Sequence, residues 1–496
     1  MLNFTFDPPS GEIRSRATQG LAATGLAQMV RLAVQTTSVI VLSRLLTPAD
    51  FGIIAVTVPI FTLVALLQDL GLSEATVQKG SLTQNEISSA FWVNLGVSLL
   101  CAVLLLVIAP LLGRFYSDDR VEAVTAAISI LVLISGAGTQ HLALLNRRMR
   151  FWALAAIDIT ATVGGFMATL AFALINPTYW AIYTGIFIAS LISLFGSWSL
   201  ARWHPLSPWR STYTNAMISF GANITGASIA AYLVRNLDNI LIGRVWGVEQ
   251  LGFYDRAYRF LLLPLQQVNK PLGKVMIPTL SRLNRTPEHY RTAFLAAVTL
   301  LMLLTLPGVA FIVGAADPLI TVLLGPKWEA STSILIALGF AAFLQPLNSS
   351  SSWLFISQGR TAELLLSGTL SAIGCSIAFL LGLSYGPIGI AIAYSASECL
   401  RTPVLWWYVT RLGPVSFREM TGVFVPHSLS TIMSLVTVYM IVSQMNLPVW
   451  PKIITSLVLS YLASAVVLML FPSRRRIIYR SITIGRELVT GHRGAD

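Results

Sequence analysis

The feature that most constrains this chain is a series of apolar stretches, most of them about 20 residues long or longer. One helix of that length crosses the hydrocarbon core of a bilayer, where the backbone must satisfy its own hydrogen bonds. The pattern therefore predicts an all-α integral membrane protein with about fourteen transmembrane helices. Their expected bounds are 19–45, 51–71, 88–112, 121–144, 151–174, 178–201, 215–243, 250–273, 292–315, 331–357, 361–383, 386–409, 420–444 and 450–472.

The distribution of charge supports this fold class and indicates an orientation. Only 11% of the 496 residues are charged, whereas soluble domains carry about 25%. With both termini in the cytoplasm, the inner loops are rich in Lys and Arg, and the outer loops hold only Arg114, Arg120, Lys327 and Lys452. This asymmetry follows the positive-inside rule and predicts cytoplasmic termini. The net charge of +12 then reflects the membrane topology. The sequence has no basic domain with interleaved aromatic residues, so it does not indicate nucleic-acid binding.

A short pattern occurs twice, about 200 residues apart. "LSRLLTPADFGIIA" (Leu42–Ala55) and "IGRVWGVEQLGFYD" (Ile242–Asp255) share an arginine and a glycine at the same offset. "NRRMRF" (Asn146–Phe151) and "SQGRTA" (Ser357–Ala362) likewise stand at equivalent joints between helices. The chain therefore reads as two similar halves followed by a helix pair.

The repeat predicts the domain organisation. Each half has six helices, an even number, so both halves enter the membrane from the same side and are parallel repeats around a central cavity. The expected division is an N-terminal half at 1–203, a C-terminal half at 204–412, and an extra transmembrane pair with a basic tail at 413–496.

Motifs of catalysis are absent from the sequence. It has no P-loop, H-E-x-x-H, G-x-S-x-G or paired-cysteine metal motif, and the connections between apolar stretches are short. We therefore expect a transporter without a cofactor rather than an enzyme. The N-terminus also lacks a compact signal peptide, so the segment 19–45 is expected to stay in the final protein.

Three stretches carry a resemblance to a known family. They are "SRLLTPADFGIIAVTVPIFTLVALLQDLGLSEATVQK" (Ser43–Lys79), "LLNRRMRF" (Leu144–Phe151) and "YDRAYRFLLLPLQ" (Tyr254–Gln266). With the fourteen helices and paired halves, the chain resembles bacterial polysaccharide transporters, the Wzx-like flippases of the multidrug/oligosaccharidyl-lipid/polysaccharide (MOP) exporter superfamily. The resemblance implies a multi-pass protein of the bacterial inner membrane. It would move undecaprenyl-diphosphate-linked oligosaccharide from the cytoplasmic to the periplasmic leaflet by alternating access, beside polysaccharide polymerase machinery.

The implied product is exopolysaccharide, capsule or O-antigen, and three other functions stay open. A drug exporter of the same superfamily would favour an acidic pocket for cationic drugs. A peptidoglycan-precursor flippase would share the fourteen-helix form. A membrane polysaccharide polymerase, the rival that is an enzyme, would be expected to carry a large outer loop.

The implied cargo needs a hydrated, cationic passage for its diphosphate. Arginine suits that role because it stays charged and can donate two hydrogen bonds to one phosphate group. In the first segment Arg31, Gln28 and Gln35 lie on one helical face at spacings of three and four. We take them as candidates for the diphosphate and glycan path, since ionisable groups inside a membrane are commonly functional. The alternative is the headgroup-facing side of a shallow helix.

Further along the chain, other polar groups are candidates for the same path. Arg235 and Asp238 stand three residues apart, so they either neutralise each other or leave Arg235 for phosphate and Asp238 for titration. Asn239 adds polarity beside them. Arg44 and Arg244 are either interface anchors or release-side phosphate contacts. Arg256 is a further candidate, within a cluster of arginines and tyrosines.

Carboxylates inside apolar segments are candidates for coupling or gating. A buried carboxylate can bind H⁺ or Na⁺ and bias the protein toward one facing state. It can equally pair with a nearby arginine, as Glu398 can with Arg401. The candidates are Asp69, Asp158, Asp238 and Glu398.

Overall fold

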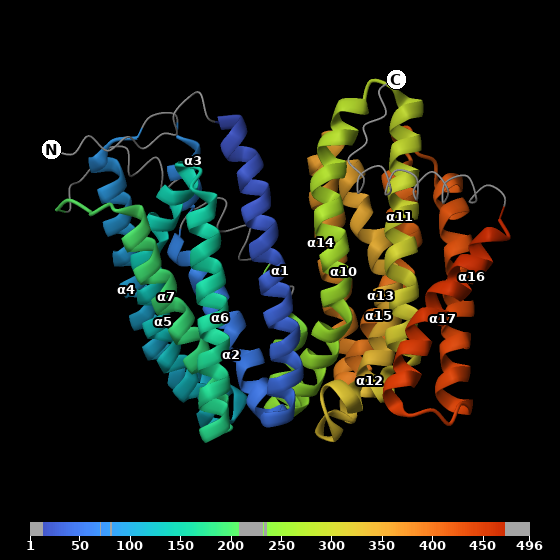
Figure 1. The fold of residues 1–496 in the computed structure, drawn as a ribbon, viewed down its shortest axis with the longest axis horizontal. Coiled ribbons are helices and arrows are strands. Elements are labelled where there is room, and N and C mark those ends of the chain that lie inside the picture. Colours follow the sequence, from blue (N-terminus) through green and yellow to red (C-terminus); the bar gives the residue numbers. More distant parts are fainter. Residues whose placement is uncertain (1–12, 70, 80–81, 208–231, 233–235, 472–496) are drawn as a thin grey trace. The chain divides into compact units, whose positions relative to one another are not determined.

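The computed structural model describes residues 13–69, 71–79, 82–207, 232 and 236–471. All regular elements in these ranges are helices (Figure 1). Eleven candidate spans in them are long and apolar enough to cross a membrane, so the chain is a multi-pass membrane protein whose described part is all-helical. The predicted count of fourteen stays a prediction, because most of the segment 215–243, including Arg235, lies outside the described residues.

The chain forms two compact units, Met1–Gly252 (unit 1) and Phe253–Asp496 (unit 2). The helices of unit 1 are α1 (Ile13–Leu45), α2 (Pro48–Asp69), α3 (Leu72–Gln78), α4 (Gln84–Tyr116), α5 (Asp119–Arg147), α6 (Phe151–Ile175), α7 (Tyr179–Ala201) and α9 (Leu237–Val245). The helix α10 (Gly247–Leu283) begins in unit 1 and continues into unit 2.

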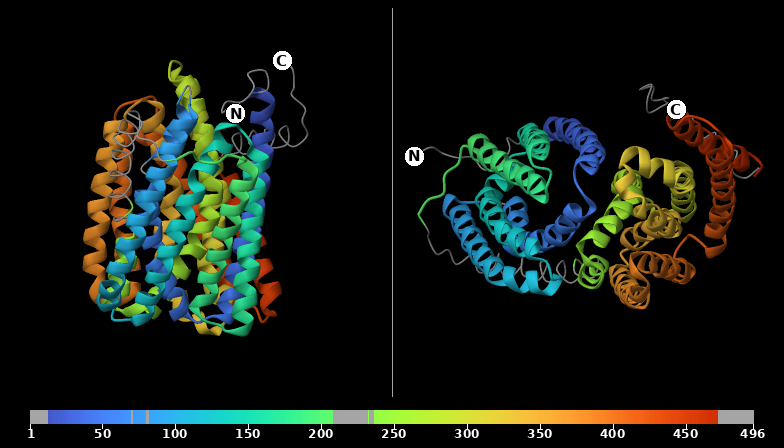
Figure 2. Two further views of the ribbon diagram at one scale, coloured as in Figure 1. Left: turned by 90° about the vertical axis from the view of Figure 1, so that its left-hand side faces the viewer. Right: turned by 90° about the horizontal axis from the view of Figure 1, so that it is seen from below.

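The remaining helices of unit 2 are α11 (Pro287–Gly314), α12 (Ala316–Leu323), α13 (Ala330–Ser357), α14 (Thr361–Gly382), α15 (Gly386–Thr410), α16 (Phe417–Gln444) and α17 (Val449–Met469). The last two form a pair at one side of unit 2 (Figure 2). They are held to α11 because Ser460 Oγ donates to Pro307 O at 2.7 Å and Tyr461 OH donates to Leu304 O at 2.9 Å.

The start of α2 explains the "TPAD" part of the repeated pattern. Thr47 and Asp50 form a reciprocal cap, in which Asp50 Oδ2 accepts from Thr47 N at 2.9 Å and Asp50 N donates to Thr47 Oγ1 at 3.3 Å. Pro48 is the first helical residue, where a missing N–H costs nothing. Asp50 Oδ1 also accepts from Tyr179 N at 2.9 Å, so the same carboxylate fixes the start of α7.

The repeated glycines allow the two copies of the pattern to cross. A Cβ atom built on Gly52 would lie 1.6 Å from Val248 O, and one built on Gly252 would lie 2.0 Å from Pro48 O. The contact is reciprocal, because each glycine faces the carbonyl four residues before the other. Only a residue without a side chain permits backbones to approach this closely.

The two joints identified in the sequence have the same backbone pattern. Met149 and Gly359 both have positive φ, 53° and 72°. The next residue, Arg150 or Arg360, donates its N–H five residues back, to Leu145 O at 3.0 Å or Phe355 O at 2.8 Å. A new helix, α6 or α14, then begins. The predicted equivalence of these joints is therefore found in the structure.

Candidate functional site

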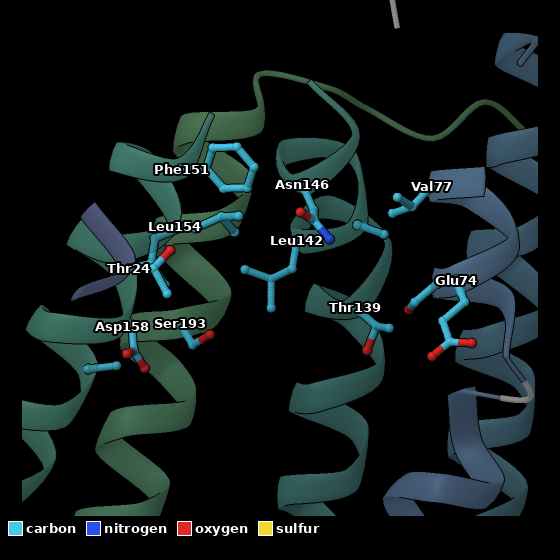
Figure 3. A pocket seen from close by; sticks show the side chains of 14 residues that line it. Thr24, Glu74, Val77, Thr139, Leu142, Asn146, Phe151, Leu154, Asp158 and Ser193 are labelled. Carbon is cyan, nitrogen blue, oxygen red and sulfur yellow. The ribbon is translucent and has the colours of Figure 1, made fainter. Parts of the chain in front are cut away.

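A cavity of about 810 Å³ lies in unit 1 among α1, α3, α5, α6 and α7. In the view of Figure 3, Thr24, Asp158 and Ser193 lie at one side and Glu74 lies at the other. Apolar side chains, including Phe151, complete the wall. The polar side chains that line the cavity are Thr24, Ser73, Glu74, Thr139, Asn146, Asp158 and Ser193.

The short helix α3 brings Ser73 and Glu74 to the cavity. The chain turns at Gly71, whose φ is 67°, and Asp69 Oδ1 then accepts from Ser73 N at 3.2 Å and Ser73 Oγ at 2.6 Å. This contact caps the first turn of α3. The other side of α3 is fixed to α5, because Thr76 Oγ1 donates to Gln140 Oε1 at 3.0 Å.

The wall between α1 and α6 contains an ion pair. Arg31 of α1 donates to the carboxylate of Asp158 on α6, and both side chains are more than a quarter exposed. Small side chains, Ala23, Ala27 and Ala155, let the two helices pack closely beside it. The structure thus brings together two of the predicted site residues that stand 127 positions apart.

Aromatic packing positions α7 against α5. Trp198 Nε1 donates to Ala137 O at 2.9 Å, and the His141 ring stacks on Trp198 with centroids 4.3 Å apart. His141 Nε2 lies 3.2 Å from Trp203 O. These contacts fix the faces of α5 and α7 that carry Thr139 and Ser193.

The arginines of "NRRMR" hold helix ends at the joint. Arg147 Nη1 donates to Thr76 O at 2.8 Å, Arg148 Nη1 to Ala201 O at 2.9 Å, and Arg150 Nη1 to Leu200 O at 2.6 Å. Carbonyls at helix C-termini lack intrahelical partners and favour cations. These three arginines therefore stabilise the C-terminal ends of α3 and α7.

The charge of the cavity differs from the cationic passage expected for a diphosphate. Its lining has two carboxylates, those of Glu74 and Asp158, and no Lys or Arg. The nearby Arg31 is paired with Asp158. Among the described residues, no three His, Cys, Asp or Glu side chains are grouped as a metal site would require. The cavity therefore offers hydrogen-bond acceptors and neutral polar groups rather than a phosphate clamp.

The other predicted residues of unit 1 lie apart from this lining. Gln28 and Gln35 are exposed on α1, and Arg44 is exposed at its end. Arg244, at the end of α9, lies over the Phe115 ring at 5.4 Å. Asp69 caps α3 as described above.

Near α9, Asp238 is buried and accepts from the backbone N–H of Asn239 at 2.9 Å. Arg235, the predicted partner of Asp238, lies outside the described residues. Arg256 belongs to unit 2, where it is half-buried on α10. The roles predicted for these residues stay predictions.

Glu398 lies in a polar cluster of unit 2. Its Oε2 accepts from Asn348 Nδ2 at 2.9 Å and from Arg401 Nη2 at 2.5 Å. Arg401 Nη1 also donates to Ser371 Oγ at 2.8 Å. The cluster therefore links α13, α14 and α15, and the pairing of Glu398 with Arg401 is the alternative that the sequence left open.

Sequence reasoning missed most of the polar lining of the cavity. Glu74, Asn146, Thr139 and Ser193 were not predicted, since they lie far apart in the sequence and none of them belongs to a recognisable motif. One signal was present: "DLGLSE" has an aspartate, a glycine and a serine in the order that ends one helix and caps the next.

Comparison with protein families gives a match to the model described as "Polysaccharide biosynthesis protein", over residues 41–333. This is more than half of the chain. The chain belongs to the polysaccharide biosynthesis protein family.

Relatives of this polysaccharide biosynthesis protein are similar along most of their length. It is 26% identical over 370 residues to the teichuronic acid biosynthesis protein TuaB of Bacillus subtilis, covering 74% of this chain and 76% of the relative. It is 21% identical over 350 residues to the lipopolysaccharide biosynthesis protein WzxC of Escherichia coli, covering 70% and 71%.

Solved structures define the fold of this family member. A lipid II flippase MurJ in an inward closed conformation matches with a TM-score of 0.70 and 16% identity, over 94% of this chain and 100% of that one. A multidrug resistance MATE transporter of the MOP superfamily, inward-facing, matches with a TM-score of 0.60 and 16% identity, over 79% and 98%. The fold is therefore that of these two transporters.

Proposed function

We propose that this protein is a flippase of the bacterial inner membrane. It moves undecaprenyl-diphosphate-linked oligosaccharide repeat units from the cytoplasmic to the periplasmic leaflet, for synthesis of exopolysaccharide, capsule or O-antigen. One observation carries the proposal: a chain of the polysaccharide biosynthesis family has the fold of a lipid flippase along 94% of its length. A fold alone does not determine function, so the family membership supplies the biosynthetic role.

The polar cavity within unit 1 supports transport rather than catalysis. It places hydroxyl, amide and carboxylate groups among membrane helices, where such groups are costly unless they serve a ligand or a partner. Alternating access would expose such groups to one side of the membrane at a time. Asp158 is our candidate for coupling to H⁺ or Na⁺, because its carboxylate lines the cavity. The Glu398 carboxylate already accepts from Asn348, Cys375 and Arg401, which fits a structural role.

The sidedness of the lipid-linked repeat unit tests the function. Cells depleted of the protein should accumulate the repeat unit in the cytoplasmic leaflet and lose surface polysaccharide. The same measurement after re-expression of the intact chain is the control. Normal delivery of single repeat units to the periplasm, followed by failure to polymerise, would instead identify a polymerase.

A drug exporter is the second candidate, and a specific observation favours it. Two carboxylates and no basic side chain line the cavity of unit 1, which suits an organic cation. Depleted cells would then become sensitive to cationic dyes and keep their surface polysaccharide. A peptidoglycan-precursor flippase would be recognised by lysis on depletion.

A further inference from the structure

We infer that the cavity of unit 1 is a subsite for the sugars of the cargo, and that the diphosphate is held outside it. The inference rests on the proposed flippase function and adds which part of the cargo this cavity takes. Three properties of the cavity carry it: its unused hydrogen-bonding groups, its apolar wall and its charge.

Four polar side chains that line the cavity make no side-chain hydrogen bond to another described residue. They come from four helices, α1, α3, α5 and α7, and surround the space in Figure 3. Together they present a carboxylate, an amide and two hydroxyls, so both donors and acceptors are available. A sugar hydroxyl also donates and accepts, and it can use all of them. The four residues are Thr24, Glu74, Asn146 and Ser193.

The apolar part of the wall complements these groups. Phe151, Leu142 and Leu154 line the same space. A sugar ring has apolar C–H faces and a polar rim, so it can contact both kinds of surface at once. Ligand pockets generally combine mostly apolar walls with a few placed polar groups, and they measure about 300–1,000 Å³. The volume of about 810 Å³ falls within that range.

Charge excludes the diphosphate from this space. Glu74, which has no ion pair with a described residue, would repel an anion, and like charges brought together in a site of low dielectric are costly. Arg31 is bound to Asp158, and Nη1 of Arg148 and Nη1 of Arg150 each donate to a carbonyl of α7. The uncharged sugars are therefore the part of the cargo that matches the cavity.

Photocrosslinking can identify which part of the cargo occupies the cavity. Val77 lines the space, and p-benzoylphenylalanine in its place would react with a bound molecule. The probe is lipid-linked oligosaccharide extracted from the producing cells, with radiolabel in the sugars, added to the purified full-length protein. Leu174 on α6 is exposed and does not line the cavity, so the same photoreactive residue there is the matched control.

Mild acid then distinguishes the outcomes, because it cleaves the bond between the first sugar and the diphosphate. Label that stays on the protein after acid, at position 77 and not at position 174, supports the glycan subsite. Label that acid releases means that lipid or phosphate was captured, and it overturns the inference. Absence of a product above the Leu174 control also overturns it. If the Val77 variant fails to fold, the same residue in place of Leu142 provides the measurement.

Substitutions in the lining give an independent readout. The double variant Asn146→Ala with Ser193→Ala should lower the glycan crosslink several-fold, whereas Ser199→Ala, on an exposed part of α7, should leave it unchanged. An unchanged crosslink in the double variant counts against the subsite. The sidedness experiment on depleted cells separates the two proposals: repeat units trapped inside with no glycan crosslink reject the subsite alone, whereas normal export rejects the flippase.

Discussion

Unit 1 and unit 2 each contain an arginine–carboxylate pair beside a cavity or groove, but one pair joins two helices and the other lies within one helix. In unit 1, Arg31 and Asp158 join two helices, and the carboxylate lines a cavity with seven polar side chains. In unit 2, Glu398 and Arg401 are three residues apart on α15, and the arginine lines a mostly apolar groove of about 650 Å³ between α14 and α15. The carboxylate of unit 2 is buried, whereas that of unit 1 is one-third exposed.

This difference indicates two roles for intramembrane charge. A pair within one helix, such as Glu398 and Arg401, keeps its geometry when neighbouring helices move. A pair between helices breaks when those helices separate, and its exposure lets a ligand or ion compete. We therefore expect the pair of unit 2 to contribute mainly to stability and the pair of unit 1 mainly to transport.

Removing the buried carboxylate should have the largest effect on stability. Glu398→Ala leaves Arg401 without its carboxylate partner and leaves Asn348 Nδ2 with Thr402 Oγ1 as its remaining acceptor, and breaking a buried pair in this way costs about 3–5 kcal/mol. Thermal unfolding of the purified protein in detergent measures the loss. Glu398→Gln, which keeps an acceptor, should be less damaging. Normal unfolding with loss of export would instead make Glu398 a coupling group.

The two joints should differ in strength although their backbones match. Arg360 donates to Val409 O and Leu412 O and pairs with Glu363, so Arg360→Ala should destabilise the protein by about 3 kcal/mol. Arg150 has one such carbonyl contact, so Arg150→Ala should cost about 1 kcal/mol. The unfolding temperatures of the two variants test this order. Equal losses would contradict it.

A side chain at the glycine crossing should destabilise unit 1. Gly52→Ala places a methyl group against Val248 O, and the backbones must separate, at a cost of about 1–3 kcal/mol. Gly25→Ala is the matched control, because a Cβ there meets nothing within 4 Å and alanine favours a helix by about 0.5–1 kcal/mol. The difference between the two variants in thermal unfolding is the measurement. A stable Gly52→Ala protein would mean that the crossing opens easily.

The exposed pair of unit 1 should contribute least to stability. Arg31→Gln and Asp158→Asn should each change the free energy of unfolding by less than about 1 kcal/mol, since exposed ion pairs contribute little. Export of polysaccharide should nevertheless fall in both variants. A double-mutant cycle, read by unfolding and by export, separates the two effects. Full export in both single variants would remove Asp158 from the transport mechanism.

The sequence predicts the long helices well because their signal is local. The expected segments 361–383 and 386–409 correspond to α14 at Thr361–Gly382 and α15 at Gly386–Thr410, where glycines mark the break. The helix α3 was not predicted, because it begins at Leu72, directly after the expected segment 51–71. It has only seven residues, and it depends on the cap from Asp69 and on the distant contact between Thr76 and Gln140.

The candidate site was predictable only in part, for a related reason. A helical stripe identifies Arg31 as unusual, but its partner is 127 residues away and is fixed by packing of alanines between α1 and α6. Spacing rules apply within one helix, which is why Arg401 could be named as a partner of Glu398. The cavity gathers single polar residues from five helices, and no local pattern reveals such a set.

The glycine crossing also has a consequence for the origin of the chain. Gly52 meets Val248 and Gly252 meets Pro48, so exchanging each residue for the one 200 positions away reproduces the contact. Self-complementary contacts of this kind are the mark of two-fold symmetric homodimers. A contact that two identical subunits would make across an axis here joins two segments of one polypeptide. The crossing is thus what gene duplication and fusion of a once dimeric ancestor would leave behind.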